Sequence, residues 1–537
     1  MTRGAGDASV TTRPSRHSDR GALLGVAIIA IATGVLRVWN LSYGLPGLLD
    51  PDGPVVVDRA QLLAHGHLPT TYDWPTGSMM MVAFLFRTVG RIGDLAGTTG
   101  GQYTLARAGF AAVSVALTFS TGLLAVQSTN GRTAQRVSGW TAALLIGVAY
   151  SAVRLGRTLH PEELQALFAT LSLVCTLCFD RDRDRRARWL VGSAALAGAA
   201  AGSKYLGVVC VCALVASILT SGHEWRTRAR WLLIAAASSV ATFVVLVPGA
   251  IFEHAAFVDG LRYQVFHQGG GHVGYDGAGP AFGFNLFEAL PGSLGLPFTV
   301  LAVLGVVLAI IRRRRAEAFV ALFVVVAFVA LGVSRVEFPH YILLFLPALC
   351  ALAPGPILVA ADSARHRFAT RPGAMPWFWA AVAVLVIGAA TPLVLNDARL
   401  LRAQGAVNTR EVAAPIVRDL PGPVIKEAYT DESDVGTAIG AVGSDPNVPS
   451  CSCFVVVSSY MEDRFRREPD RYRAEVAVYD AVRKNGRQYA QVAPSLPLSY
   501  RWDLLPDYGL HNIPLTGGDP LVVGPTITIF DLRDARS

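Results

Sequence analysis

Carboxylates and histidines gather in one polar stretch near the start of the chain, at residues 41–76. It follows directly on an apolar run, residues 21–39, and contains Asp50, Asp52, Asp58, Asp73, His65 and His67. A carboxylate at the end of a membrane helix indicates a functional site, because burying a charge there is costly. A positioned carboxylate can also take the proton from a hydroxyl group, which is general base catalysis. The alternative is a solvated loop, since Asp-Pro-Asp-Gly is typical of a turn.

Further polar residues lie at the ends of later apolar runs. They are His160, Glu162, Glu163, Lys204, Tyr205, His267, His272, Tyr275, Asp276, Arg335, Glu337, His340 and Tyr341. If these ends converge, they form a polar cavity in which Lys and Arg could hold a phosphate while an apolar groove holds a lipid tail. Lys204 and Arg335 could instead be snorkelling anchors. The pair His65 and His67 is a weak signal for zinc.

Composition identifies a membrane protein. The chain has 537 residues, of which 52% are hydrophobic and 16% charged, and its mean hydropathy is +0.42. Soluble domains contain about 25% charged residues, and apolar runs of about 17–22 residues are typical of membrane helices. The net charge of +8 lies largely in short Arg clusters between these runs. Such clusters orient membrane helices, so no nucleic-acid partner is predicted.

The Arg clusters predict the topology. Arg3, Arg13, Arg16 and Arg20 place the N-terminus, residues 1–20, in the cytoplasm. Residues 77–90 are too short to span and are predicted to lie on the membrane surface within an outer loop, residues 40–103. Counting them as a span would reverse the side of every later cluster. The sequence thus predicts a polytopic α-helical membrane protein with about eleven spans in residues 21–395.

The last part of the chain, residues 396–537, has short strand-like apolar runs and two helical patterns. These patterns predict an α/β domain, which the topology places outside the cytoplasm. Cys451 and Cys453 lie in this domain one residue apart. They could be free thiols or form a local disulfide.

Four short motifs resemble those of a known family. They are Pro51-Asp52 followed by Pro54, Tyr72-Asp73-Trp74-Pro75, Gly202-Ser203-Lys204-Tyr205, and Phe338-Pro339-His340-Tyr341 with Pro347. Over about residues 20–395 the chain resembles the bacterial protein-mannosyltransferase-like glycosyltransferases of family 39. These are integral membrane enzymes of the GT-C superfamily, related to the lipid A aminoarabinose transferases.

The resemblance implies a multi-pass bacterial plasma-membrane enzyme with a GT-C fold. It would move a monosaccharide, with inversion, from a polyprenyl phosphate to a protein, lipid or glycan acceptor on the outer face. Asp52 would be the general base, with Glu162 as a second catalytic carboxylate and Asp50 as a rival base. Lys204, Arg335 and Tyr205 would bind the donor phosphate. The acceptor side would comprise Asp73, His160, Glu163, His267, His272, Tyr275, Asp276, Glu337, His340 and Tyr341.

This sequence also departs from the family pattern. The acidic residue that usually follows the catalytic aspartate is Gly53 here, and the carboxylate of the second outer loop is Glu162 or Glu163, not Asp. The first change leaves open a catalytically inactive protein that binds envelope glycans. A lipid or sugar transporter is disfavoured, because transporters place their polar groups near the bilayer midplane. Chemistry of this kind need not involve a metal; a divalent metal stays an open alternative, but the sequence alone gives no convincing ligand set.

The predicted topology can be tested with fusions. We expect a reporter that is active only outside the cytoplasm to be active when fused after Ser537, because the Arg clusters place the C-terminal domain outside. Activity of a strictly cytoplasmic reporter at the same position would contradict the topology.

Overall fold

In the computed structural model of this protein, most of the chain is described. The described residues are 19–45, 52–182, 185–276, 279–369, 373–430, 435–496, 498–516 and 520–533. Asp50, the predicted rival base, lies outside them.

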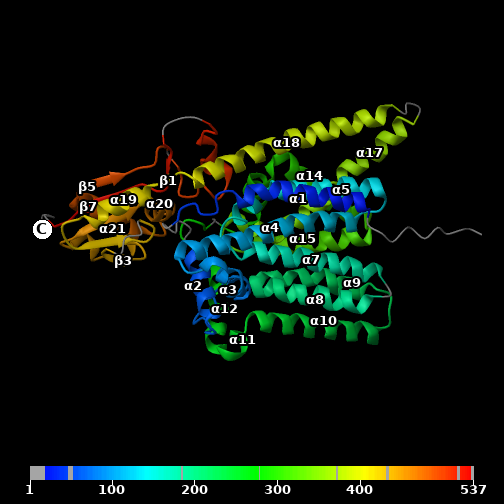
Figure 1. Cartoon of the computed structure of the whole chain (residues 1–537), viewed down its shortest axis with the longest axis horizontal. Helices are drawn as coiled ribbons and strands as arrows, with labels where there is room; N and C mark the ends of the chain where they lie inside the picture. Colours follow the sequence, from blue (N-terminus) through cyan, green and yellow to red (C-terminus); the bar gives the residue numbers. More distant parts are fainter. Residues whose placement is uncertain are drawn as a thin grey trace, which may run out of the picture.

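The first large unit is a bundle of apolar helices (Figure 1). Eight helices or helical runs of the described chain are long and apolar enough to cross a membrane. They are α1 (Arg20–Val38), α4 (Thr99–Ser128), α7 (Glu162–Arg181), α10 (Trp225–Leu246), the run Phe282–Arg312 that ends in α14 (Leu290–Arg312), α15 (Arg315–Gly332), the run Leu346–Arg367 formed by α16 (Leu346–Leu352) and α17 (Gly355–Arg367), and α18 (Ala374–Gln404).

Three shorter helices occupy the positions of the other predicted spans. They are α5 (Arg132–Gly147), α8 (Arg186–Ser203) and α9 (Val211–Leu219). Each predicted span therefore coincides with a helix, and the predicted polytopic helical fold is confirmed. Short turns complete the bundle: α6 (Tyr150–Leu155), η2 (Tyr205–Cys210), α13 (Phe282–Phe284) and η3 (Asn285–Ala289).

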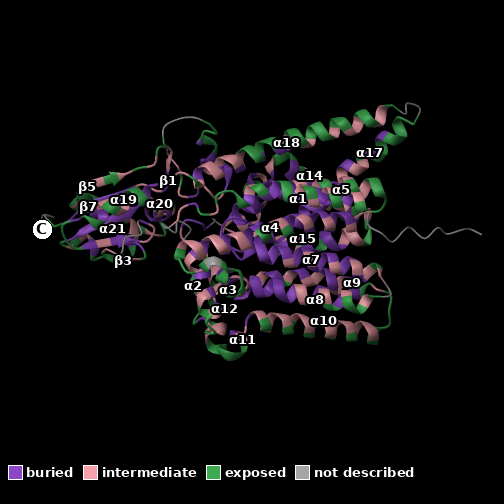
Figure 2. Ribbon diagram, in the orientation of Figure 1, coloured by how far each residue is buried: buried purple, intermediate pink, exposed green. Residues whose placement is uncertain are grey.

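Burial separates central helices from peripheral ones. In their most apolar windows, α7 is 78% buried and α4 is 67% buried, whereas α18 is 11% buried and α10 is 6% buried. Figure 2 shows the same contrast along the bundle. A helix that is apolar on all sides, and whose side chains the rest of the protein does not cover, must face lipid. Thus α10 and α18 lie at the lipid-facing edges, while α4 and α7 form the centre.

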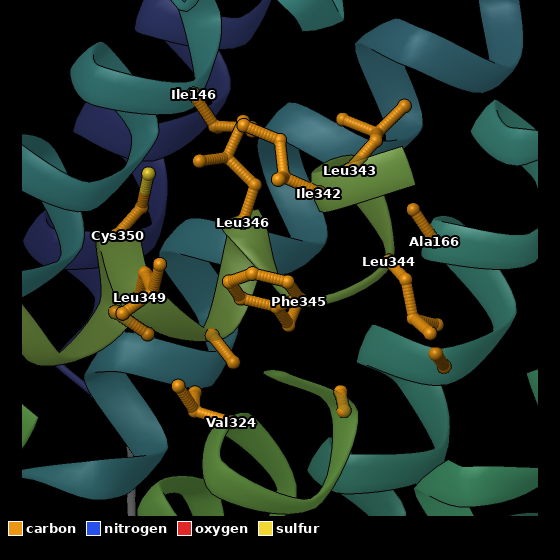
Figure 3. Packing of buried hydrophobic residues seen from close by; sticks show 14 of the residues in the cluster. Ile146, Ala166, Val324, Ile342, Leu343, Leu344, Phe345, Leu346, Leu349 and Cys350 are labelled. Carbon is orange, nitrogen blue, oxygen red and sulfur yellow. The ribbon is translucent and has the colours of Figure 1, made fainter. Parts of the chain in front are cut away.

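A short segment of broken helix fills the middle of the bundle. It consists of η4 (Pro339–Leu344) and α16, and its apolar side chains are buried. Figure 3 shows Phe345 and its neighbours packed among side chains from other elements, including Ile146 and Val324. This packing fixes the start of η4, where two predicted site residues lie.

Shorter helices cover the end of the bundle that faces the C-terminal domain, here called the domain-facing end (Figure 1). They are α2 (Gly53–Ala64), α3 (Gly77–Arg87), η1 (Val89–Asp94), α11 (Gly249–Phe252) and α12 (His254–Gly270). Phe84 of α3, Ile92 of η1 and Phe266 of α12 are exposed apolar side chains. Exposed aromatic and aliphatic groups beside membrane helices suit a membrane surface.

The C-terminal unit is built on a five-stranded sheet. Its strand order is β3 (Thr437–Ile439), β2 (Val424–Glu427), β4 (Phe454–Ser458), β7 (Ile527–Asp531) and β5 (Arg487–Val492). Strand β2 is parallel to β3 and β4, whereas β7 is antiparallel to β4 and β5. Two further strands, β1 (Val407–Asn408) and β6 (Val522–Val523), pair separately. The predicted C-terminal α/β fold is confirmed.

Helices pack on both faces of this sheet, because successive side chains of a strand point to opposite faces. Val455 and Val457 of β4 pack with residues of α20 (Ser459–Arg466) and α21 (Arg473–Asn485). Phe454 and Val456 pack with residues of α19 (Thr409–Arg418). Short turns η5 (Val442–Ser444), η6 (Val448–Ser450), η7 (Pro506–Tyr508) and η8 (Leu510–Asn512) connect these elements. Cys451 and Cys453 form a disulfide.

One buried carboxylate ties three elements of this domain together, and its removal should unfold the domain at lower urea concentration. Glu427, 1% exposed, accepts hydrogen bonds from the main-chain N–H groups of Val442 and Ser458, at 2.8 and 2.9 Å, and from the Tyr479 hydroxyl. Each buried donor that is left without an acceptor lowers the free energy of unfolding by about 1–3 kcal/mol. We therefore expect Glu427→Ala to destabilise the domain by about 3 kcal/mol or more, measured by proteolysis of the full chain in increasing urea.

The matched control is Glu411→Ala, which removes an exposed carboxylate from α19. Exposed substitutions of this kind cost about 0.5 kcal/mol or less. Equal destabilisation by the two substitutions would contradict the bridging role of Glu427.

Candidate functional site

A polar cavity of about 370 Å³ lies where the domain-facing end of the bundle meets the C-terminal domain. Its wall brings together predicted site residues from five separate segments of the chain. They are Asp52, Asp73, His160, Glu162, Lys204, His267, His272, Tyr275, His340 and Tyr341. The ends of these apolar runs therefore converge, which is the condition under which they form a polar cavity.

Asp52 stands at the beginning of α2. Pro54 occupies the first turn of that helix, where its fixed φ suits the helix and its missing N–H costs nothing. The Asp52 carboxylate lies 3.6 Å from Nδ1 of His160, and its side chain is 39% exposed. This exposure leaves the carboxylate open to a reacting molecule in the cavity.

Glu162 and Lys204 form a buried ion pair on the cavity wall. Glu162 is the first residue of α7, and Lys204 follows the last residue of α8. The positive end of a helix dipole favours a carboxylate at that position. The Lys204 ammonium also lies 4.1 Å from the ring centroid of Tyr341, a cation–π distance. These contacts hold one cation at a defined point of the cavity.

Two histidines flank Glu162. Nδ1 of His160 lies 3.8 Å from one carboxylate oxygen, and Nε2 of His340 lies 3.5 Å from the other. Burial lowers the pKa of His340 well below its ordinary value, although the Glu162 carboxylate opposes the shift. His340 is therefore neutral at pH 7 and can act as a hydrogen-bond donor or acceptor, or as a ligand.

His160, Glu162 and His340 also have the composition of a metal-binding set. One ligand atom from each lies within 4.8 Å of the others, and two imidazoles with one carboxylate suit zinc and related ions. Lys204 already contacts one oxygen of Glu162, whereas the other oxygen, Oε2, has no hydrogen-bond partner. The residues thus fit a divalent cation that binds through Oε2. Such an ion would supply charge stabilisation for a bound phosphate.

A neutral histidine connects the Gly-rich segment, residues 269–276, to the C-terminal domain. Burial, followed by the charge of Arg464, lowers the pKa of His272 to about 3. Its Nε2 therefore accepts a hydrogen bond from the Arg464 guanidinium, at 2.5 Å. Arg464 also donates to the carbonyl oxygen of Val273, at 3.0 Å. The cavity wall at this point is cationic through Arg464, not through the histidine.

Five predicted site residues of the described chain do not line the polar cavity: Tyr205, which lines an adjoining apolar cavity, and Glu163, Asp276, Arg335 and Glu337. Glu163 is fully buried in the bundle and accepts a hydrogen bond from Ser114, at 3.3 Å. Arg335 pairs at 3.4 Å with Asp276, which also binds Arg471 of the C-terminal domain. Glu337 is half-buried. The geometry thus gives Glu163, Arg335 and Asp276 structural contacts that hold the bundle or the Gly-rich segment in place.

The C-terminal domain supplies a wall that the sequence did not predict. This wall includes Asn408, Arg410, Tyr429, Tyr460, Arg464, Tyr500 and Asp503. Asp503 pairs with Arg154 of α6 at 2.8 Å, and its main-chain oxygen accepts a hydrogen bond from Tyr150. Arg154 could have been identified from the sequence, because it is a charged residue at the end of an apolar run. The aromatic and arginine residues of the domain carry no such local signal.

A second, apolar cavity of about 390 Å³ adjoins the polar one. Its walls come from α12, the end of α15, the beginning of η2 and the end of η4, and include Tyr205, Leu206, Leu261, Val265, Leu331 and Leu344. The hydroxyl of Tyr205 donates to the carbonyl oxygen of Tyr72, at 2.7 Å. Six residues line both cavities: Asp73, Trp74, Glu162, Lys204, Gln264 and Tyr341. The ammonium of Lys204 therefore stands at the junction of a polar and an apolar space.

Comparison with known proteins identifies similar chains. A family model described as dolichyl-phosphate-mannose-protein mannosyltransferase matches residues 103–248, a segment that includes His160, Glu162 and Lys204. A search of curated proteins found no sequence match.

Solved structures of membrane glycosyltransferases share the fold. The oligosaccharyltransferase AglB from Archaeoglobus fulgidus, in complex with an inhibitory peptide and a dolichol-phosphate, is 13% identical with a TM-score of 0.55; the match covers 88% of this chain and 73% of AglB. ArnT from Cupriavidus metallidurans in the apo state is 15% identical with a TM-score of 0.52, over 83% of this chain and 95% of ArnT. ArnT bound to undecaprenyl phosphate has a TM-score of 0.51. The predicted resemblance to GT-C membrane proteins is confirmed.

Proposed function

We propose that this chain is a membrane glycosyltransferase of the GT-C type. It transfers a monosaccharide from a polyprenyl-phosphate donor to a protein, lipid or glycan acceptor, with inversion. The observation that carries the proposal is the junction of the polar and apolar cavities at Lys204. A polyprenyl-phosphate sugar has the matching three parts: an apolar chain, a phosphate and a polar sugar.

The donor fits the two cavities in one orientation. Its polyprenyl chain occupies the apolar cavity between α12, α15 and η4, which lies beside the lipid phase. Its phosphate lies at Lys204, because an ammonium in a site screened from water forms strong charge-assisted hydrogen bonds to phosphate oxygens. Its sugar then projects into the polar cavity towards Asp52 and His160.

Asp52 serves as the general base in this arrangement. A hydroxyl oxygen of the acceptor attacks the anomeric carbon as its proton passes to the Asp52 carboxylate. The bond between the anomeric carbon and the phosphate oxygen breaks, and its electron pair leaves with the polyprenyl phosphate. Attack opposite the leaving group inverts the anomeric configuration. Lys204 stabilises the charge that develops on the departing phosphate.

The acceptor enters along the C-terminal domain. The wall on that side carries Tyr429, Tyr460 and Tyr500 together with Arg410 and Arg464. Aromatic faces and arginines suit a sugar or a polar chain, because they combine stacking with hydrogen bonding. This position places the incoming hydroxyl on the side of the cavity opposite the donor chain.

The orientation that follows is an N-terminus in the cytoplasm and a C-terminal domain outside the plasma membrane of a bacterium. The Arg clusters support it through the positive-inside rule. The disulfide between Cys451 and Cys453 supports it as well, because disulfides persist in oxidising compartments outside the cytoplasm. The free cysteines of the described chain all lie in the bundle.

Lys204 should bind the donor phosphate. Substituting Lys204 alone would leave Glu162 as an uncompensated buried charge, which is strongly destabilising. We therefore compare the double variant Lys204→Gln/Glu162→Gln, which leaves no unpaired charge, with the parent protein. Loss of one charge-assisted contact should weaken polyprenyl-phosphate binding about 10- to 100-fold in the double variant, measured on purified folded protein. Equal affinity of the double variant and the parent would contradict the phosphate role of Lys204.

Asp52 should be essential for transfer but not for donor binding. Asn keeps the shape of the side chain and removes its basicity, and a positioned base contributes about 10²–10⁴-fold in rate. We expect Asp52→Asn to lower sugar transfer by about that factor, measured with a radiolabelled donor in purified membranes, while donor affinity stays unchanged. The control is Asp58→Asn, an exposed carboxylate on the same helix. Near-parent transfer by Asp52→Asn, with loss in Asp50→Asn, would move the base to Asp50.

A further inference from the structure

The opposite end of the bundle contains a second large polar cavity, of about 700 Å³. Helix α7 links the two sites: Glu162 begins it beside the catalytic cavity, and Asp180 and Arg181 lie at its other end. At a rise of about 1.5 Å per residue, this helix is about 30 Å long, the thickness of a bilayer core. The cavity lined by Asp180 and Arg181 therefore lies near the other membrane surface and takes no part in the transfer site.

Arginines dominate the lining of this cavity. They are Arg132, Arg181, Arg312, Arg314, Arg315 and Arg365, against the carboxylates of Asp180 and Asp362. Asp180 forms an ion pair with Arg315 at 2.6 Å, and Asp362 forms one with Arg365 at 3.5 Å. Within the described chain, Arg132 and Arg312 have no carboxylate within ion-pair distance. The cavity thus carries an excess of positive charge.

Two helix N-termini add to that charge. Helix α5 begins at Arg132 and α15 at Arg315, and neither start has a side-chain hydrogen bond to its free N–H groups. Gly131, which precedes α5, has φ +89° and open space where a Cβ would stand. Unsatisfied N–H groups and the positive end of the dipole favour anions at such a start. Both features lie in the same cavity as the arginines.

Apolar surface adjoins the arginines. Trp379 of α18 lines the cavity, and a tryptophan beside basic residues is typical of a membrane interface. The lipid-facing side chains Ile311 of α14 and Leu385 of α18 are exposed. In Figure 1 the hairpin of α17 and α18 diverges from the bundle at this end, and Figure 2 shows its exposed surface. The cavity thus opens beside surfaces that acyl chains can cover.

We propose that this cavity binds the headgroup of an anionic phospholipid, with its acyl chains against α14 and α18. Guanidinium groups match phosphate oxygens in charge and geometry, and basic pockets between membrane helices hold anionic lipid headgroups. A pure orientation signal needs charge but no cavity. The basic start of α10 illustrates the difference, because Arg226 and Arg230 of this helix are exposed and lie outside the cavity lining.

The test measures lipid binding and does not depend on sugar transfer. Full-length protein is purified in detergent and titrated with phosphatidylglycerol, phosphatidylcholine or soluble glycerol 3-phosphate, with native mass spectrometry as the readout. The variant Arg132→Gln/Arg312→Gln removes two cations without breaking an ion pair of the described residues. The control Arg226→Gln/Arg230→Gln removes the same charge from the exposed segment.

We expect the parent protein to bind phosphatidylglycerol in preference to the other two ligands. The cavity variant should bind it about 30-fold more weakly, since each arginine near an anionic headgroup contributes about fivefold. The control should stay within about threefold of the parent. Equal weakening in the control, no preference over phosphatidylcholine, or equal binding of glycerol 3-phosphate would overturn the proposal. Circular dichroism and the melting temperature of both variants establish that they are folded.

Discussion

The ion pair between Lys204 and Glu162 is the interaction on which the site depends. Removing one partner of a buried pair costs about 3–5 kcal/mol, because the remaining charge is left without compensation. The pair is therefore stable only where both helices that carry it are fixed. Helices α7 and α8 meet this condition: they pack along their length, and Ser172 and Thr176 of α7 form hydrogen bonds with Ser193 of α8 at 2.8–3.1 Å. Small polar residues allow such close approach between membrane helices.

The same pair begins a chain of polar contacts that crosses the cavity. Lys204 contacts Glu162, Glu162 lies 3.8 Å from His160, and His160 lies 3.6 Å from Asp52. In the proposed reaction, negative charge leaves on a phosphate at one end of this chain, and a proton is taken up at the other. A phosphate at Lys204 competes with Glu162 for the ammonium, so donor binding alters the charge that His160 and Asp52 experience. His340 is neutral, so the charge of the site is set by the two carboxylates and the lysine.

The sequence was informative where local composition decides the structure and silent where distant segments meet. Apolar length predicted the bundle helices, and short apolar runs predicted that the C-terminal domain contains strands. The ends of the predicted spans identified Asp52, Glu162, Lys204 and His340, because a polar or charged group next to a bilayer is costly and usually has a function. The same rule also selected Arg335 and Glu163, since it cannot tell which face a side chain takes. Arg464 had no signal, because its partner His272 is 192 residues away in the sequence.

The C-terminal domain completes the cavity because several polar contacts attach it to loops of the bundle. Arg154 binds Asp503, Asp276 binds Arg471, and the Tyr500 hydroxyl donates to the carbonyl oxygen of Gly274 at 2.6 Å. These contacts join the domain to α6 and to the Gly-rich segment, which themselves line the cavity or border it. The shape of the acceptor side is therefore a property of the interface and not of either unit. Under the proposed function, changes in the C-terminal wall alone would alter the choice of acceptor and leave the donor site intact, because Tyr429, Tyr460 and Arg464 do not line the apolar cavity.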